Sequence, residues 1–86
     1  MAMSVAMRES WEKAKAYDDT LTADDPRFNH MAYICHEDGS IFLLQNAFVM
    51  DNDPWLWVFT EHQGMFVFAK GDLVLYTEYK NQVYIP

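Results

Sequence analysis

Hydrophobic residues recur at helical spacing along the first quarter of the chain. They follow one another at steps of three or four residues, which places them on one stripe of an α-helix. The members of this stripe are Met3, Met7, Trp11, Ala14, Tyr17 and Leu21. The pattern predicts a helix over about residues 4–17 whose stripe packs against the rest of the protein. Asp18 and Asp19 predict its end, because the helix macrodipole disfavours negative charge at the C-terminus.

From Met31 onward the pattern changes to short β-branched and aromatic runs separated by turn residues, which is typical of strands. The runs cover residues 31–36, 40–45, 55–60, 65–69, 73–79 and 83–85. Asp38 and Gly39 form a strong hairpin signal between the first two. Because every connection is short, we expect consecutive antiparallel pairing. The predicted fold class is α+β, with an N-terminal helix packed on a five- or six-stranded antiparallel meander.

Both faces of the predicted strands are apolar. Trp55, Trp57 and Phe59 share one face of their strand, and Leu56 and Val58 share the other, since successive side chains point to opposite faces. One helix can cover only one face of a sheet. The other face must be covered by curling of the sheet into a small barrel, by a second subunit in a homodimer, or by a partner protein. The sequence leaves these alternatives open.

A chain of 86 residues, of which 51% are apolar, is expected to fold as one domain over residues 1–86. Cys35 is the only cysteine, so an intramolecular disulfide is impossible and a reducing compartment is favoured. The first residues lack signal-peptide features, and no run approaches the roughly 18 continuous apolar residues of a membrane span. We therefore expect a cytoplasmic protein without a membrane segment.

The chain carries 13 acidic and 6 basic residues, for a formal charge of −7. Binding to nucleic acid or anionic lipid requires Lys and Arg clustered on one face, whereas the basic residues here are scattered along the chain. The charge therefore argues against direct nucleic-acid or membrane binding. It favours attraction to a basic protein surface.

Residue spacing argues against metal, cofactor and catalytic sites. The residues that could ligate zinc are His30, Cys35, His36 and His62. None of them forms the close pair that zinc sites use, and Cys35 and His36 should point to opposite faces of one strand. The isolated Gly39, Gly64 and Gly71 form no phosphate-binding loop. The sequence thus predicts no metal, no cofactor and no enzymatic activity.

The preferred interpretation is a small acidic intracellular binding protein that inhibits or regulates a partner protein by occupying its surface. Acids near predicted turns would steer association, and two tryptophans would anchor it. These candidate partner-binding residues are Asp18, Asp19, Asp24, Asp25, Asp51, Asp53, Trp55 and Trp57. The composition is typical of inhibitors such as those by which phages disarm host defence or polymerases. A nucleic-acid-handling enzyme would offer a basic groove for which the acids could compete.

Two alternatives belong to other classes. A small barrel-type module could bind a peptide or small ligand through an aromatic groove, and an uncovered row of Tyr76, Tyr79 and Tyr84 would mark it. An enzyme using His62 or Cys35 is the least favoured alternative, because no supporting constellation of residues accompanies them.

Overall fold

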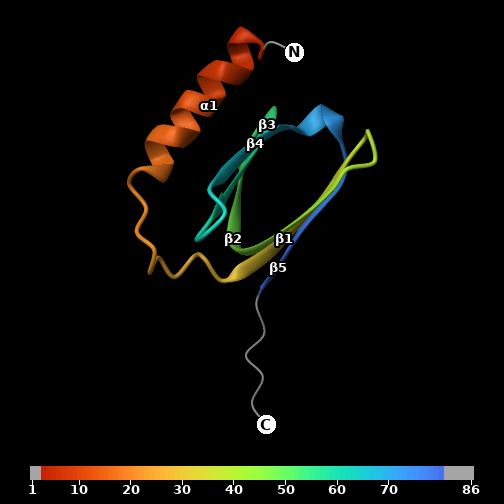
Figure 1. Cartoon of the computed structure of the whole chain (residues 1–86). Helices are drawn as coiled ribbons and strands as arrows, with labels where there is room; N and C mark the ends of the chain where they lie inside the picture. Colours follow the sequence, from red (N-terminus) through yellow and green to blue (C-terminus); the bar gives the residue numbers. More distant parts are fainter. Residues whose placement is uncertain (1–2, 81–86) are drawn as a thin grey trace.

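A computed structural model describes residues 3–80 of the chain (Figure 1). The elements, in chain order, are α1 (Val5–Asp18), β1 (His30–His36), β2 (Ile41–Asn52), β3 (Trp55–Thr60), β4 (Met65–Ala69), the 3-10 turn η1 (Lys70–Asp72) and β5 (Leu73–Lys80). The α+β class, the helix and five strands of the sequence prediction are therefore confirmed. The sixth predicted strand, over residues 83–85, lies outside the described residues. No helix within residues 3–80 is both long and apolar enough to cross a lipid bilayer.

The helix α1 begins where its sequence provides a cap. Ser4 Oγ accepts a hydrogen bond from the backbone N–H of Met7 at 3.1 Å, which satisfies one of the free donors of the first turn. The buried positions of α1 are Ser10 and Ala14, whereas Trp11 is 39% exposed. The buried stripe is therefore rotated slightly from the predicted one, and Trp11 lies beside it.

The sheet is antiparallel throughout, with strand order β4-β3-β2-β1-β5. The first four strands form the predicted meander. The last strand departs from it, because β5 pairs with β1 rather than with β4, its neighbour in sequence. Three residues of η1 suffice for this connection because the sheet curls and brings its two edges together at that end (Figure 1). The edge strands β4 and β5 do not pair, so the curled sheet is not closed.

A β-bulge at Asn46 divides β2 into two halves. Ala32 of β1 pairs with Leu44 of β2, and His30 of β1 pairs with Ala47 of β2. Two residues along β1 therefore correspond to three residues along β2. The extra residue on β2 bends the strand. Asn46 has a φ of 49°, a left-handed conformation that asparagine adopts more readily than most residues. The half before the bulge pairs with β1, and the half after it pairs with β3.

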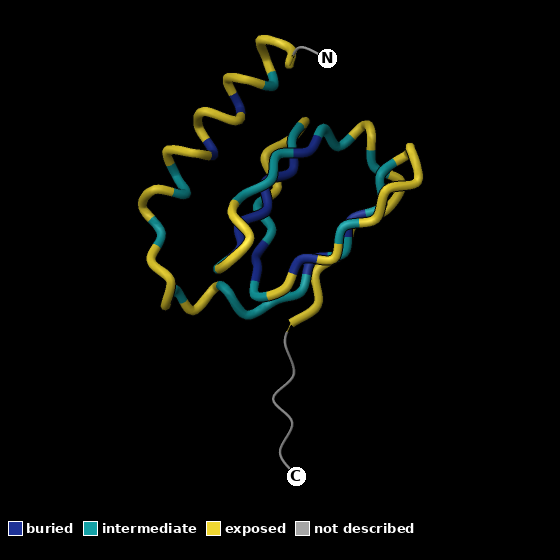
Figure 2. The backbone as a smooth tube through the Cα atoms, in the orientation of Figure 1, coloured by how far each residue is buried: buried dark blue, intermediate teal, exposed yellow. Residues whose placement is uncertain are grey.

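The bend produces two hydrophobic clusters on opposite sides of the sheet. The inner cluster, inside the curl, comprises Ala32, Ile34, Leu44, Ala47, Leu56, Val58 and Phe68. The outer cluster, between the sheet and α1, comprises Ala14, Phe48, Trp57 and Phe59. The predicted division of β3 into two apolar faces is confirmed. Curling covers one face and α1 covers the other, so the buried segments line the inside of the curl and the helix side of β3 (Figure 2).

Candidate interaction surfaces

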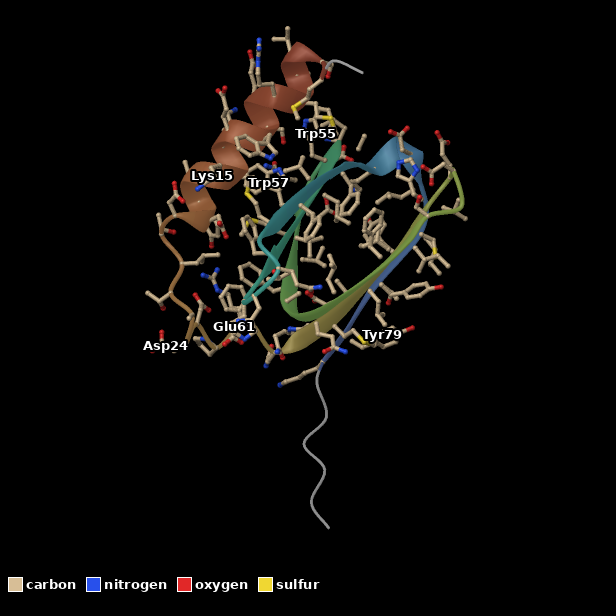
Figure 3. All side chains as sticks on the ribbon, in the orientation of Figure 1. Lys15, Asp24, Trp55, Trp57, Glu61 and Tyr79 are labelled. Atoms are coloured by element: carbon tan, nitrogen blue, oxygen red, sulfur yellow. The ribbon has the colours of Figure 1, made fainter. Side chains whose placement is uncertain are left out.

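The acids proposed for partner binding fall into two groups at opposite ends of α1. Asp18, Asp19, Asp24 and Asp25 lie at the C-terminus of α1 and in the loop after it. Asp51 and Asp53 lie at the β2–β3 turn, beside Trp55. Figure 3 shows Asp24 at one end of the helix and Trp55 near the other. The predicted acids therefore do not form one continuous patch.

The first group is joined by Glu61 of the β3–β4 turn, and together these residues form what we call the acidic end. Its members are Asp18, Asp19, Asp24, Asp25 and Glu61. A surface hollow of about 260 Å³ lies between the loop and the turn, with Asp18 on one side and Glu61 and His62 on the other. Sequence analysis did not include Glu61 among the partner-binding residues, because its approach to the loop depends on how α1 packs on β3 and β4.

Arg27 fixes the loop of the acidic end. Its guanidinium donates hydrogen bonds to the carboxylate of Asp25 at 2.9 Å and 3.1 Å and to the hydroxyl of Tyr17 at 2.6 Å. It also lies over the ring of Phe48, 4.7 Å from the centroid, which adds a cation–π contact. The hydrogen bonds from Arg27 lower the pKa of Asp25 to about 2. The loop is thus held against α1 and β2 while Asp24 projects from it as an exposed residue.

Lys70 neutralises much of the second acidic group. Its Nζ lies 3.0 Å from Asp51 Oδ1 and 3.2 Å from Asp53 Oδ1, and its backbone N–H donates to the carbonyl of Pro54 at 2.9 Å. Hydrogen bonding to Asp51, and to a smaller extent to Asp53, raises the pKa of Lys70. These contacts tie η1 to the β2–β3 turn. Asp51 and Asp53 therefore offer a partner less uncompensated charge than the acidic end does.

The two tryptophans have different environments. Trp57 is 6% exposed and lies in the outer cluster beneath α1, where its indole Nε1 donates a hydrogen bond to Ser10 Oγ at 2.9 Å. It is a core residue, so it cannot serve as the surface anchor that the sequence suggested. Trp55 is half-buried and packs against the same cluster. Alternation along β3 places both side chains on the helix side, and α1 covers that side.

The structure reveals an exposed apolar surface that sequence analysis missed, and we call it the uncharged face. It lies on the outer side of β1, β5 and the first half of β2, where α1 does not reach (Figure 1). Its members are Met31, Tyr33, Cys35, Ile41, Leu43, Leu75, Thr77 and Tyr79. Ile41, Leu43, Leu75 and Tyr79 are each more than half exposed. Exposed apolar surface of this kind is characteristic of interaction sites.

Cys35 lies on the central strand of the uncharged face, in its end row, between Ile41 on β2 and Leu75 on β5. Hydrogen bonding with the Cys35 thiol raises the pKa of the neighbouring Tyr33. His36, the next residue, lies on the other side of β1 and approaches Asp38 at 3.2 Å. Within residues 3–80, no group of three or more His, Cys, Asp or Glu side chains is arranged to hold a metal ion.

The aromatic row proposed for a ligand groove is divided between two surfaces. Tyr76 pairs with Ile34 and Tyr79 pairs with Met31, so the two tyrosines lie on opposite faces of β5. Both are exposed, Tyr79 the more so. Tyr84 lies outside the described residues. No single groove joins Tyr76 and Tyr79.

Comparisons of this chain with protein-family models, with curated protein sequences and with solved structures found no match.

Proposed function

We propose that this protein is a non-enzymatic binding protein that inhibits or regulates a partner protein by occupying a basic surface on it. The observation that carries this proposal is the acidic end. It holds five carboxylates, of which those of Asp18 and Glu61 line a hollow. Lys15 pairs with Asp19, Arg27 pairs with Asp25, and His62 lies 3.3 Å from Glu61. A concentration of one sign of charge steers association with a surface of the opposite sign.

A nucleic-acid-handling enzyme is the partner class that best suits this chemistry. Its substrate groove must present clustered Lys and Arg to phosphates. Carboxylates such as those of the exposed Asp24 and the half-buried Asp18 can compete for the same cations. A phage-type inhibitor of host defence or of a host polymerase would act in this way. The hollow between the loop and the β3–β4 turn would accommodate a basic side chain projecting from the partner's groove.

The proposal is tested by neutralising the acidic end and comparing with a variant of equal charge. Asp18→Asn, Asp24→Asn and Glu61→Gln together remove three negative charges from the acidic end. The matched control, Glu9→Gln, Glu12→Gln and Glu37→Gln, removes three charges from exposed positions on α1 and at the β1–β2 turn. Tagged versions of the wild type and both variants are used to capture proteins from nuclease-treated lysate at low salt, and the captured proteins are then eluted with salt.

We expect the wild type and the control to capture the same basic protein and to release it as salt rises, because salt screens exposed charge pairs. The acidic-end variant should bind that protein about tenfold more weakly or worse. With the partner purified, an oligonucleotide should displace the wild type. Equal capture by both variants, or capture insensitive to salt and oligonucleotide, would contradict the proposal.

A further inference from the structure

The side chains of β5 depart at several positions from the alternation expected for an edge strand with one solvent face. Glu78 pairs with Ala32 of the inner cluster, so the charged residue lies on the side of the core. Leu75, Thr77 and Tyr79 lie on the outer side. A sheet with one solvated face ordinarily places polar residues outward and apolar residues inward. The apolar outward positions of β5 therefore do not contribute to this chain's own core.

The uncharged face carries no acidic or basic side chain, although the chain as a whole has 13 acidic and 6 basic residues. The charged residues of β5, Glu78 and Lys80, lie on its other side. A basic partner would find no carboxylate on this surface to pair with. Burying the face against an identical surface, in contrast, removes no charge from water and so avoids the high cost of desolvating a charge.

We propose that the uncharged face is the contact surface of a homodimer, in which the uncharged faces of two copies pack against each other. Two chains of charge −7 repel each other, so a contact that brings no carboxylate of one copy against a carboxylate of the other keeps this repulsion low. An isologous contact, in which each copy contributes the same patch, meets this condition. Tyr33 lies at the centre of the patch, and Cys35 lies two residues away on the same central strand, so both become covered in the dimer.

The face packs without using the edges of the sheet. The register of β5 shifts between the partners of Cys35 and His36, and Glu78 is an inward-pointing charge. Both features protect an edge strand from pairing with another sheet. The contact is therefore made by side chains, face to face. It lies on the side of the sheet away from α1 (Figure 1), so the acidic end of each copy stays free and the inference does not depend on the proposed function.

The size and charge of the copies set the expected strength of the dimer. A standard interface takes about 800 Å² from each partner. The face is smaller, since it is three strands wide and its five-residue strands are about 16 Å long at 3.3 Å per residue. We therefore expect a reversible dimer with a dissociation constant in the micromolar range. Salt should strengthen it by screening the repulsion between the two acidic chains. Salt has the opposite effect on binding to a basic partner.

The test is sedimentation of the full chain from about 1 µM to about 1 mM, at low salt and again at about 0.5 M salt, where screening is nearly complete. The mass should rise with concentration from that of a 10.1 kDa monomer toward twice that value. In high salt this rise should occur at lower protein concentration. Leu43→Glu places a charge on the face and should weaken dimerisation at least tenfold. Val5→Glu is the matched control, since Val5 is similarly exposed but lies on α1.

Circular dichroism establishes that each variant is folded. Tyr79→Ser is a second variant on the face, which adds no charge and should also weaken the dimer. Protection of Cys35 from alkylation should increase with protein concentration in the wild type and not in Leu43→Glu. A wild-type chain that remains a monomer at every concentration and salt would overturn the inference. So would a folded Leu43→Glu that dimerises like the wild type, or a face that only a different protein covers. Leu43→Glu should still capture the salt-sensitive partner, so the two proposals can fail separately.

Discussion

The indole of Trp57 on β3 donates a buried hydrogen bond of 2.9 Å to the hydroxyl of Ser10 on α1, 47 residues away in the chain. This bond satisfies a donor that the outer cluster would otherwise leave unpaired. It also fixes the rotation of the helix on the sheet, because the serine must face β3. A polar residue thus occupies a central position on the buried stripe of α1, and Trp11 lies at its margin.

Replacing Ser10 by alanine should destabilise the fold by about 1–3 kcal/mol, because the buried indole N–H of Trp57 loses its acceptor. In a Trp57→Phe background the donor is already absent, so the same replacement should cost much less. Urea unfolding followed by circular dichroism measures all four proteins of this cycle. An equal cost of Ser10→Ala in both backgrounds would show that the bond does not contribute.

The bulge at Asn46 predicts an unusual order of stability among substitutions. Asn46→Gly should be more stable than Asn46→Ala by about 1 kcal/mol, because glycine adopts a positive φ without a steric penalty. Both variants lose the asparagine side chain, so their difference isolates the backbone effect. At the neighbouring Gln45, an exposed β2 residue without a positive φ, the order should reverse. Thermal unfolding of the four variants checks this, and alanine favoured at both positions would contradict the bulge.

The pair between Asp25 and Arg27 predicts a contribution to stability that disappears in acid. The pKa of Asp25, about 2, is below the ordinary value for an aspartate, so the folded state favours the charged form of its carboxylate. The contribution is therefore complete above about pH 4, near the unfolded pKa, and is lost as the pH falls through 2. Asp25→Asn should lower the urea midpoint at pH 7, and its difference from the wild type should shrink below pH 4.

Asp24→Asn is the control for this measurement, since the Asp24 carboxylate instead accepts a hydrogen bond from Thr22 Oγ1 at 2.7 Å. Its difference from the wild type should be smaller than that of Asp25→Asn at pH 7. A gap between Asp25→Asn and the wild type that stayed constant from pH 7 to about pH 2 would rule out this pair as its source.

Glu78 provides a contact across the curl of the sheet. Its Oε2 accepts a hydrogen bond from the backbone N–H of Val49 at 2.6 Å. This bond links β5 to the part of β2 that follows Ala47, where β2 no longer pairs with β1. Glu78→Ala should cost about 1 kcal/mol or more by removing the acceptor, whereas Glu78→Gln retains an acceptor oxygen and should cost less. Amide hydrogen exchange at Val49 should accelerate in the alanine variant alone. Unchanged exchange there would argue against this contact.

Local sequence patterns determined where the elements lie and which faces of β3 and β4 are apolar. The range of β3 and that of β4 were predicted residue for residue, because strand propensity and turn residues act over a few positions. The hairpin at Asp38 and Gly39 was predicted for the same reason, and Gly39 has the positive φ that this turn requires. The end of β2 was not predicted, since the strand continues through the bulge at Asn46.

Only the tertiary structure decided which strands pair and which surfaces are exposed. The pairing of β5 with β1, the approach of Glu61 to the loop, and the burial of Trp57 beneath Ser10 all join residues that are distant in sequence. Alternation shows that Leu75 and Glu78 lie on opposite faces of a strand, but it does not show which face is inward. That choice depends on the curl of the whole sheet, because the curl determines which side of β5 meets the core.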